Sequence, residues 1–483
     1  MARTVTLRTR LESRKRVPTT IRTFQTAMNF LNSMTNYEKM TRVGYTSVNF
    51  NLARMNRLLA ALGNPHRKLR SVHIAGSKGK GSTAAMLSSM LSNAGLCVGL
   101  YTSPHVTTIR ERIQVDGEMI TETEMTKLMA KIAPLAGRAA KDQPTFFEIL
   151  TALAFLYFVN KKVDIAVVEA GLGGRLDSTN VLKPEVCGIT SISLDHVGQL
   201  GNTLEQIAEE KAGIFKAGVP AVSAPQPGEV RQVLDRVAAK VRTPLHFTGK
   251  DIEFSYRFES SQGTGPHTRV SLTTGSSRFE HLAVPMPGDH QAINCGLALS
   301  LMAILKEKGL KIDDQMAIEG LAKTWLPGRM EMVHGDPRIL LDGAHNAASV
   351  EALMRAIGQN VAYDSMVVIF GCRMDKDING MLNHIRLGAD KVIFTSTGSP
   401  RSADPAELAA EYLERSGKMA QVADRFDEAL DIAERAVTRE DLICVTGSFY
   451  LAGRAKRVIE ERYKKLKAAG AVAGARWSRL QAR

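Results

Sequence analysis

The sequence predicts an α/β fold built on parallel sheets, and three observations lead to that prediction. Short apolar runs of strand length recur along the 483 residues, with helix-forming segments between them. The run Ser71–Ala75 leads into a glycine-rich loop and then into an Ala/Met/Leu-rich stretch of helix-forming residues. The chain is also too long for one ordinary hydrophobic core, so we expect about two to three domains.

The expected strands fall into two series. The first series is Ser71–Ala75, Cys97–Thr102, Asp164–Glu169, Cys187–Ser191 and Val219–Ser223; the second is Ile339–Leu341, Met366–Phe370, Lys391–Thr395 and Leu442–Thr446. Helices are expected at Ser82–Asn93, Phe147–Asn160 and Leu204–Phe215. Polar alternation between Phe247 and Val284 predicts antiparallel strands or a hairpin. Pro327 and Gly328 punctuate the chain between the two series, which predicts a domain boundary there.

Composition excludes several classes of protein. Hydrophobic residues make up 44% of the chain and charged residues 23%, as in soluble globular proteins. No apolar run approaches the roughly 20 residues that span a bilayer, and the start has no apolar stretch typical of a secretory signal. The five cysteines are scattered without metal-ligand spacing, which fits a reducing compartment. We therefore expect a cytoplasmic protein that does not contact membranes.

The net positive charge of the chain comes from its two ends. The net charge is +14, of which residues 1–22 contribute +6 and residues 454–483 contribute +8. A nucleic-acid enzyme is expected to carry its basic stripe on the folded body instead. Solvated tails are the favoured interpretation, and weak contact with RNA or a membrane surface is the alternative. The Arg-rich start also allows a transit peptide.

The loop "HIAGSKGKGSTAAM" resembles a phosphate-binding loop with residues missing. The standard pattern places four residues between the first glycine and the Gly-Lys pair, whereas only Ser77 and Lys78 stand here. An apolar run enters the loop and a helix leaves it, so backbone N–H groups and the helix N-terminus would form an anion cradle. Lys80 would reach the terminal phosphates of a bound nucleotide, and the hydroxyl of Ser82 or Thr83 would contact a phosphate or a metal ion. A glycine-rich turn without a ligand is the alternative.

Three further strand ends carry polar groups beside that loop. Ser103 follows one strand, Glu169 ends the next, and His196 follows the apolar run Gly188–Leu194. A hydroxyl, an acid and an imidazole together predict a Mg²⁺ site, although a structural role for each remains open. Arg175 and Asp177 could form a structural ion pair. Composition alone favours a surface ion pair for Lys211, which has Glu209 and Glu210 as helical neighbours.

A series of motifs in one order identifies a resemblance over about residues 25 to 460. They are "HIAGSKGKGST", "YTSPH…ERI", "TFFEILTALAF", "EAGLGGRLDSTN", "LDHVGQLGNTLEQIAEEKAGIFK", "GDHQAINC", "LPGRMEMV", "LLDGAHN", "DKDI" and "TGSFY". The chain resembles the folylpolyglutamate synthase/dihydrofolate synthase family of the Mur ligase superfamily, which uses the shortened loop. This resemblance implies an α/β protein with a P-loop Mur-ligase-type central domain followed by a smaller Rossmann-like C-terminal domain. The expected layout is a basic extension (1–24), an ATP-binding domain (25–327), a glutamate-ligase domain (328–463) and a basic tail (464–483).

The resemblance also implies roles for individual residues. The catalytic residues would be Lys80, Lys211 (as a carbamate) and His345, and the metal ligands Ser103, Glu169 and His196. ATP would be bound by Gly79, Lys80, Gly81, Ser82, Asn294, Arg329 and Asp342. The pterin side would be lined by Thr145, Phe146, Phe147, Glu148, Leu176, Asp177 and Ser178.

The implied activity is ATP- and Mg²⁺-dependent addition of L-glutamate to dihydropteroate, to folyl-polyglutamate, or to both, with one or two Mg²⁺ ions and an acyl-phosphate intermediate. We expect a monomer that binds small molecules and no nucleic acid. The alternatives are a Mur-type ligase of a peptidoglycan precursor and nucleic-acid binding through the basic ends. Two features depart from the family pattern: Ser77-Lys78 stands where Thr-Asn is common, and the segment Asn36–Tyr45 is longer and more basic.

Overall fold

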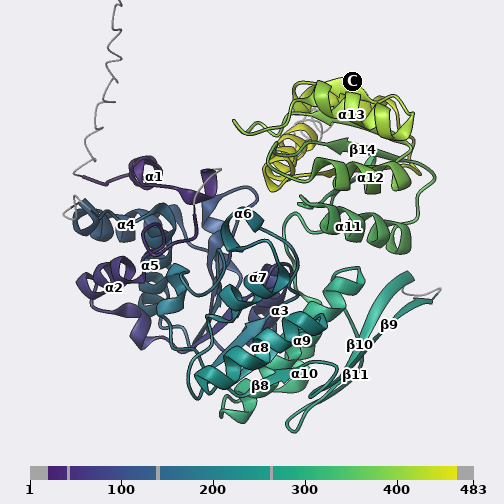
Figure 1. The fold of residues 1–483 in the computed structure, drawn as a ribbon. Coiled ribbons are helices and arrows are strands. Elements are labelled where there is room, and N and C mark those ends of the chain that lie inside the picture. The colour runs from purple at the N-terminus through teal and green to yellow at the C-terminus, as the bar shows by residue number, and fades with distance from the viewer. Residues whose placement is uncertain (1–19, 41–43, 138–141, 262–264, 465–483) are drawn as a thin grey trace, which may run out of the picture.

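The protein consists of two α/β units joined by the residues around Pro327 and Gly328 (Figure 1). The computed structural model describes residues 20–40, 44–137, 142–261 and 265–464. Nearly all of the two basic ends expected at 1–24 and 464–483 therefore lies outside the described residues.

The first unit is built on an eight-stranded sheet with the order β4-β3-β2-β5-β1-β6-β7-β8. β3 pairs antiparallel with both β2 and β4, and the other neighbours pair in parallel. The strands are β1 (Ser71–Ala75), β2 (Val98–Tyr101), β3 (Ile113–Val115), β4 (Glu118–Met119), β5 (Ile165–Glu169), β6 (Val186–Ile189), β7 (Ala221–Ser223) and β8 (Leu245–Phe247).

Helices cover both faces of this sheet because the central strands are apolar on both sides, as parallel sheets require. Val72 and Ile74 of β1 pack with α3, α9 and α10, whereas Ala166 and Val168 of β5 pack with α1, α4 and α5. The helices are α1 (Phe24–Ser33), α2 (Leu52–Ala61), α3 (Lys80–Asn93), α4 (Glu122–Gly137), α5 (Phe146–Lys161), α6 (Val197–Leu200), α7 (Leu204–Ala212), α8 (Gly228–Val241), α9 (Asp289–Glu307) and α10 (Asp314–Ala322). Short 3-10 turns lie at Tyr37–Lys39, Pro65–Lys68, Ile109–Arg112 and Ser178–Val181.

The stretch with polar alternation forms a separate antiparallel sheet, as the sequence predicts. Its strands are β9 (Glu253–Ser261), β10 (Gly265–Thr273) and β11 (Arg278–Ala283), in the order β11-β10-β9. Val270, Leu272 and Phe279 are buried against α9, and this sheet projects from the first unit below α11 in Figure 1.

The second unit is a six-stranded sheet with the order β12-β13-β17-β14-β15-β16. Only β12 is antiparallel to its neighbour. The strands are β12 (Glu331–Gly335), β13 (Arg338–Leu341), β14 (Met366–Phe370), β15 (Lys391–Thr395), β16 (Gln421–Ala423) and β17 (Leu442–Thr446). The helices are α11 (Ala347–Asn360), α12 (Ile378–Gly388), α13 (Pro405–Ser416), α14 (Phe426–Arg435) and a last helix over residues 449–464. The predicted α/β class with a smaller Rossmann-like second unit is confirmed.

Each expected strand and helix is present, and one boundary differs in a way that matters for the site. β6 ends at Ile189, so Asp195 and His196 lie on a loop and not directly at a strand end. The chain leaves the sheet there because the carbonyl of Ser191 accepts the amides of Ser77 (3.0 Å) and Lys78 (3.2 Å). α7 ends at Ala212, before the expected Phe215. None of the helices in the described residues has the length and apolar character needed to cross a bilayer.

Candidate active site

A cavity of about 1180 Å³ lies between the two units. Its walls include the loops that follow β1, β2 and β5 in the first sheet and β13, β14 and β17 in the second. Open parallel sheets bind ligands at this carboxyl edge of the strands. All the residues that the sequence predicts for the site line this cavity, except Phe146 and Lys211. The fold therefore brings two distant sets of predicted residues to one place.

The glycine-rich loop connects β1 to α3 in a conformation that only glycine adopts easily. Gly76 and Gly79 have φ values of 147° and 88°. A Cβ atom at Gly79 would lie 2.7 Å from Cγ of Asn294, so the missing side chain lets Asn294 of α9 approach the loop. This contact joins two residues that were predicted separately for nucleotide binding.

Lys80 begins α3, where the free N–H groups of the first helical turn face the cavity. Its Nζ atom donates to the carbonyl of Gly76 at 3.1 Å and lies 3.9 Å from Oε1 of Glu169. An ammonium beside a row of backbone N–H groups is a site for a phosphate chain.

Glu169 ends β5 beneath the loop that carries Ser103. Its Oε2 atom accepts the amide of Ser103 at 3.0 Å. Burial raises the pKa of Glu169, while the positive charge of Lys80 and the Ser103 amide act in the opposite direction. A buried carboxylate held beside a serine hydroxyl offers oxygen ligands of the kind that Mg²⁺ prefers.

His196 stands at the rim of the same cavity, at the N-terminus of α6. Desolvation in the cleft lowers the pKa of His196 to about 4, with Lys376, Lys211 and Lys80 as contributing positive charges. The ring is therefore neutral at pH 7, which is the form that binds a metal. No three His, Cys, Asp or Glu side chains converge as a metal-holding group in the part of the chain that the structure describes. The donor set nevertheless suits Mg²⁺, because a serine and a carboxylate supply oxygens and water completes such sites.

Lys211 is buried and is not the surface residue that composition alone favoured. Its Nζ atom donates to the carbonyl of Gly76 at 2.8 Å, directly behind the phosphate loop. Glu209 and Glu210 point elsewhere, toward Arg236 and Arg175 respectively. Burial and the charge of Lys80 lower the pKa of Lys211 to about 7. An amine with this pKa is partly uncharged near neutrality and can act as a nucleophile.

Lys78, the residue that departs from the family pattern, forms an ion pair that the sequence did not predict. Its Nζ atom lies 2.8 Å from Oδ2 of Asp195. Although burial opposes it, Lys78 holds the pKa of Asp195 far below its usual range. The added positive charge is thus balanced within the first unit.

The second unit contributes a cluster around the end of β13. The carboxylate of Asp342 is buried and accepts the amides of Met330 (2.9 Å) and Ala344 (2.8 Å). The guanidinium of Arg329 lies 4.5 Å from the ring centre of Phe449, and the ring of His345 lies 5.6 Å from it. Phe449 belongs to the "TGSFY" motif, for which sequence reasoning assigned no role.

His345 is held neutral in this cluster. Burial and the positive charges of Lys78 and Lys376 lower the pKa of His345 well below 6.5. Its Nδ1 atom lies 2.9 Å from the carbonyl of Gly343, which fixes the ring orientation. Lys376 of the "DKDI" motif also lines the cavity, on the loop after β14.

The predicted acceptor side forms one wall of the first unit. Thr145 and Glu148 make a reciprocal capping box at the start of α5, and Glu148 also forms a buried bidentate ion pair with Arg54 (2.7 and 2.8 Å). Phe147 lines the cavity, whereas Phe146 is buried in the core beneath it.

The loop after β5 supplies the remaining predicted acceptor residues. Asp177 accepts the amides of Leu172 (2.9 Å) and Thr179 (3.0 Å), and burial raises its pKa. Arg175 pairs with Glu210 at 2.8 Å, so the alternative of an Arg175–Asp177 ion pair is wrong.

The segment before α2 supplies aromatic residues that sequence reasoning missed. Tyr37 and Phe50 line the cavity with ring centres 5.1 Å apart. Tyr45 holds the loop after β5, because its hydroxyl accepts the amides of Gly174 (3.3 Å) and Leu176 (3.0 Å). The unexpected length of the segment Asn36–Tyr45 was the sequence feature that could have indicated these residues.

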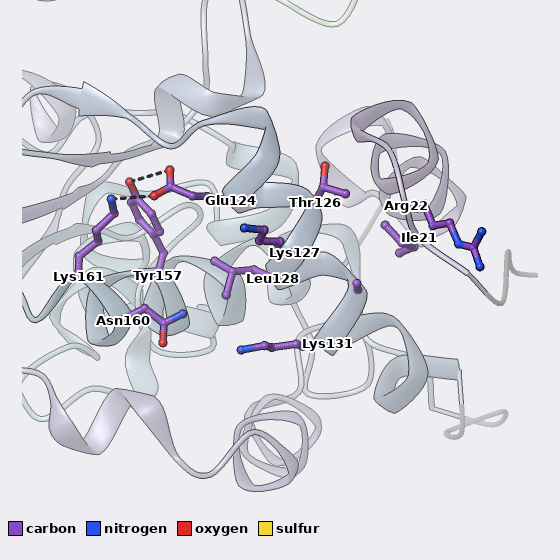
Figure 2. Close-up of a pocket in the computed structure, with 11 residues that line it drawn as sticks. Ile21, Arg22, Glu124, Thr126, Lys127, Leu128, Lys131, Tyr157, Asn160 and Lys161 are labelled. Carbon is purple, nitrogen blue, oxygen red and sulfur yellow. Dashed lines mark hydrogen bonds and ion pairs between the residues drawn. The ribbon is translucent and has the colours of Figure 1, made fainter.

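A second cavity of about 630 Å³ lies between α4, α5 and the residues Ile21 and Arg22 that precede α1 (Figure 2). Glu124 there pairs with Lys161 at 2.7 Å and accepts the hydroxyl of Tyr157 at 3.5 Å. It contains none of the predicted site residues, so the cleft between the units is the candidate active site.

Comparison with known proteins agrees with this geometry. Residues 74–302 match the Mur ligase middle domain, and residues 328–449 match the Mur ligase glutamate ligase domain. The dihydrofolate synthase/folylpolyglutamate synthase of Bacillus subtilis is 37% identical, over 83% of this chain and 92% of that protein.

Solved structures agree as well. The Mycobacterium tuberculosis folylpolyglutamate synthase complexed with ADP and AMPPCP superposes with a TM-score of 0.79 at 32% identity, covering 85% of this chain and 95% of that one. Escherichia coli FolC in complex with DHPP and ADP superposes with a TM-score of 0.76 at 29% identity, covering 92% of this chain and 99% of that one. The chain therefore belongs to the folylpolyglutamate synthase/dihydrofolate synthase family, within the Mur ligase superfamily of ATP-dependent ligases.

Proposed function

We propose that this enzyme joins L-glutamate to dihydropteroate, to folyl-polyglutamate, or to both, at the expense of ATP. One observation carries the proposal above all others. A single cavity of about 1180 Å³ is lined by a phosphate loop, a buried carboxylate beside it, and aromatic side chains on the acceptor wall. Anionic and flat aromatic portions of the reactants thus have separate places in one cleft.

The reaction would take place in two balanced steps. The acceptor carboxylate attacks the γ-phosphorus of ATP, which forms an acyl phosphate and releases ADP. The uncharged amine of glutamate then attacks the acyl carbon, so that the amide C–N bond forms and the acyl C–O bond to phosphate breaks. The extra proton on the nitrogen passes to the departing phosphate or to water. Lys80 and the N–H groups at the start of α3 would stabilise charge on the transferred phosphoryl group. The two units would align acceptor and donor.

The roles of individual residues remain those that the sequence predicts. We assign ATP binding to Gly79, Lys80, Gly81, Ser82, Asn294, Arg329 and Asp342, and acceptor binding to Thr145, Phe147, Glu148, Leu176, Asp177 and Ser178. Phe146 would support this wall from the core. Ser103, Glu169 and His196 would hold Mg²⁺, which neutralises phosphate charge when bound. His345, neutral and beside Phe449, would contribute from the second unit.

Lys211 is proposed to carry CO₂ as a carbamate. Its buried amine has a pKa of about 7, so the uncharged form that attacks CO₂ is present near neutrality. The product would be an anion beside Gly76, in a region that Lys78 and Lys80 make positive. Exchanging a buried cation for an anion there would relieve like-charge repulsion.

The expected layout of 25–327 and 328–463 is retained as a proposal. It is supported by the last helix of the first unit, which ends at Ala322, and by the first strand of the second, which begins at Glu331. We also propose a monomer in the cytoplasm. The five cysteines are all free thiols, which suits a reducing compartment.

Purified protein with ATP, Mg²⁺ and labelled glutamate tests the function directly. Dihydropteroate and a tetrahydrofolate are supplied in separate reactions, and both labelled product and ADP are measured. Product with one acceptor, or with both, identifies which activity the enzyme has. Turnover only with a UDP-linked peptidoglycan precursor would overturn the proposal in favour of the Mur-type alternative.

Nucleic-acid binding through the basic ends is tested separately. Heparin retention that disappears on deletion of residues 1–20 and 468–483, with ligation within a few-fold of the parent, would make it a side property. A large loss of turnover in the trimmed, folded protein would show that the ends serve the reaction.

A further inference from the structure

The loop after β2, residues 102–108, is fixed firmly to the first unit. The carboxylate of Glu111 accepts the amides of Val106 (2.7 Å), Thr107 (2.8 Å) and Thr108 (2.7 Å). At the start of the loop, the amide of Ser103 donates to Glu169 at 3.0 Å. Because hydrogen bonds hold both ends of this loop, a displacement of Val106 at its tip would also displace Ser103.

The tip of this loop touches the last helix of the second unit, residues 449–464, at Gly453. A Cβ atom at Gly453 would overlap the carbonyl oxygen of Val106 and would lie 2.8 Å from its carbonyl carbon. The contact is between a helix and a backbone carbonyl, so no side-chain rotation could relieve it. Glycine is otherwise a poor residue for a helix interior, where alanine is favoured. Its use here fits a need for close approach.

A second glycine completes the seat for Val106. A Cβ atom at Gly328, whose φ is 63°, would lie 3.3 Å from Cγ2 of Val106. The amide of Gly328 donates to Glu331 at 2.7 Å, and Glu331 pairs with Lys456 of the last helix at 2.6 Å. Linker and helix are thus tied together, and Val106 lies between them.

The same face of the last helix carries a group that shapes the active site. Phe449 precedes Gly453 by one turn and contacts both Arg329 and His345. The distance between the last helix and the loop therefore sets how far these residues lie from Ser103 and Glu169. We infer that Gly453 is a positioning residue for ligation, since its missing side chain lets the second unit seat on the loop that carries Ser103. This inference rests on the proposed function, because ligation needs both walls of the cleft.

The test compares Gly453→Ala and Gly453→Val with a matched control, Gly358→Ala. Gly358 also lies in a helix of the second unit, α11, but nothing lies within 4 Å of its Cβ position. We expect Gly453→Ala to lower kcat by about 10²-fold, the cost of a displacement of about 1 Å, and Gly453→Val to lower it further. The melting temperature of Gly453→Ala should not fall, since alanine favours the helix. Gly358→Ala should keep the parent kcat.

A distance measurement separates this inference from the proposed function. Spin labels on K240C and L387C in a C97S background report the separation of the two units with AMPPCP and Mg²⁺ bound; the other cysteines are buried. Gly453→Ala should lengthen this distance, and Gly358→Ala should not. Parent-like kcat and distance in Gly453→Ala, or equal losses in both alanine variants, would overturn the inference. If the parent fails to ligate glutamate, the proposed function is wrong. The distance between the spin labels then tests the positioning role of Gly453 by itself.

Discussion

The Nζ atom of Lys211 lies 2.8 Å from the carbonyl oxygen of Gly76, so the amine touches the back of the phosphate loop. Residues 135 positions apart are joined by this bond, and the lysine that makes it is only 3% exposed. A full ammonium there would face the positive charges of Lys80 and Lys78, which the carboxylates of Asp195 and Asp177 oppose, and among the described residues it forms no ion pair. The arrangement favours a modified lysine over a permanent cation.

Lys211→Ala is therefore expected to lower kcat sharply, and short carboxylic acids are expected to restore part of it. Acetate or propionate could place an anion where the proposed carbamate would lie, whereas matched alkylamines could not. The measurement is ligation with and without each additive. Parent-like activity in the variant, or equal rescue by amines, would contradict the carbamate.

Lys80→Ala is expected to lower the rate of ligation by about 10²–10³ while the fold persists. Backbone N–H groups cannot replace the positive charge that Lys80 places beside the transferred phosphoryl group. Loss of such a charge costs about 3–4 kcal/mol, or about 10²–10³ in rate. Lys323→Ala, at an exposed helix end, is the control. The measurements are kcat with ATP and far-ultraviolet circular dichroism. Near-normal turnover would remove the nucleotide assignment.

Arg54→Ala should destabilise the protein far more than Arg57→Ala, although both arginines pair with Asp142. Arg54 is buried against Glu148, with side chains 7% and 6% exposed, so its loss leaves an unpaired buried carboxylate and costs about 3–5 kcal/mol. Arg57 is 62% exposed, and its loss should stay within about 0.5 kcal/mol. Urea unfolding measures both. Equal effects would show that the Arg54–Glu148 pair is not buried in solution.

Stability should fall as pH drops below 6.5, partly through His73. Burial lowers the pKa of His73 to about 3, and Nε2 lies 2.8 Å from the Thr179 hydroxyl. Between pH 6.5 and 3 the unfolded chain binds a proton there that the folded chain does not. The free energy of unfolding therefore loses about 1.4 kcal/mol per pH unit from this residue.

His73→Gln isolates that contribution. The amide of glutamine can still contact Thr179 but does not titrate in this range. Urea unfolding at several pH values should show a slope smaller by about one proton than in the parent. An unchanged slope would mean that His73 is protonated in the folded protein.

The buried strands were predictable because a short run of consecutive apolar residues is enough to indicate each of them. β14 is apolar throughout and β17 is apolar except for Thr446; both are fully buried, and their limits coincide with the expected ones. The phosphate loop was also predictable, since glycines, a lysine and a helix start stand next to each other. The individual roles came from the family resemblance and not from periodicity.

The entry of the N-terminal segment into the cleft was not predictable, because contacts across long separations place it there. Glu38 forms a bidentate ion pair with Arg112, at 2.7 and 2.9 Å. Its carbonyl accepts Arg401 of the second unit, 363 positions away, at 2.8 Å. The burial of Lys211 was predictable from the family resemblance, together with the helical geometry that turns Glu209 and Glu210 away from it, whereas composition alone favoured a surface ion pair. The arginine partners of Glu209 and Glu210 were not predictable, because they come from other elements.

The division of the cleft between two units has a consequence for the chain during its synthesis. The phosphate loop emerges from the ribosome long before Asp342, His345 and Phe449. At about 5–20 residues per second, the interval is on the order of tens of seconds. A nascent chain in that interval contains the phosphate loop but lacks the opposite wall of the cleft. The complete cleft, with walls from both units, therefore exists only after the second unit has been synthesised.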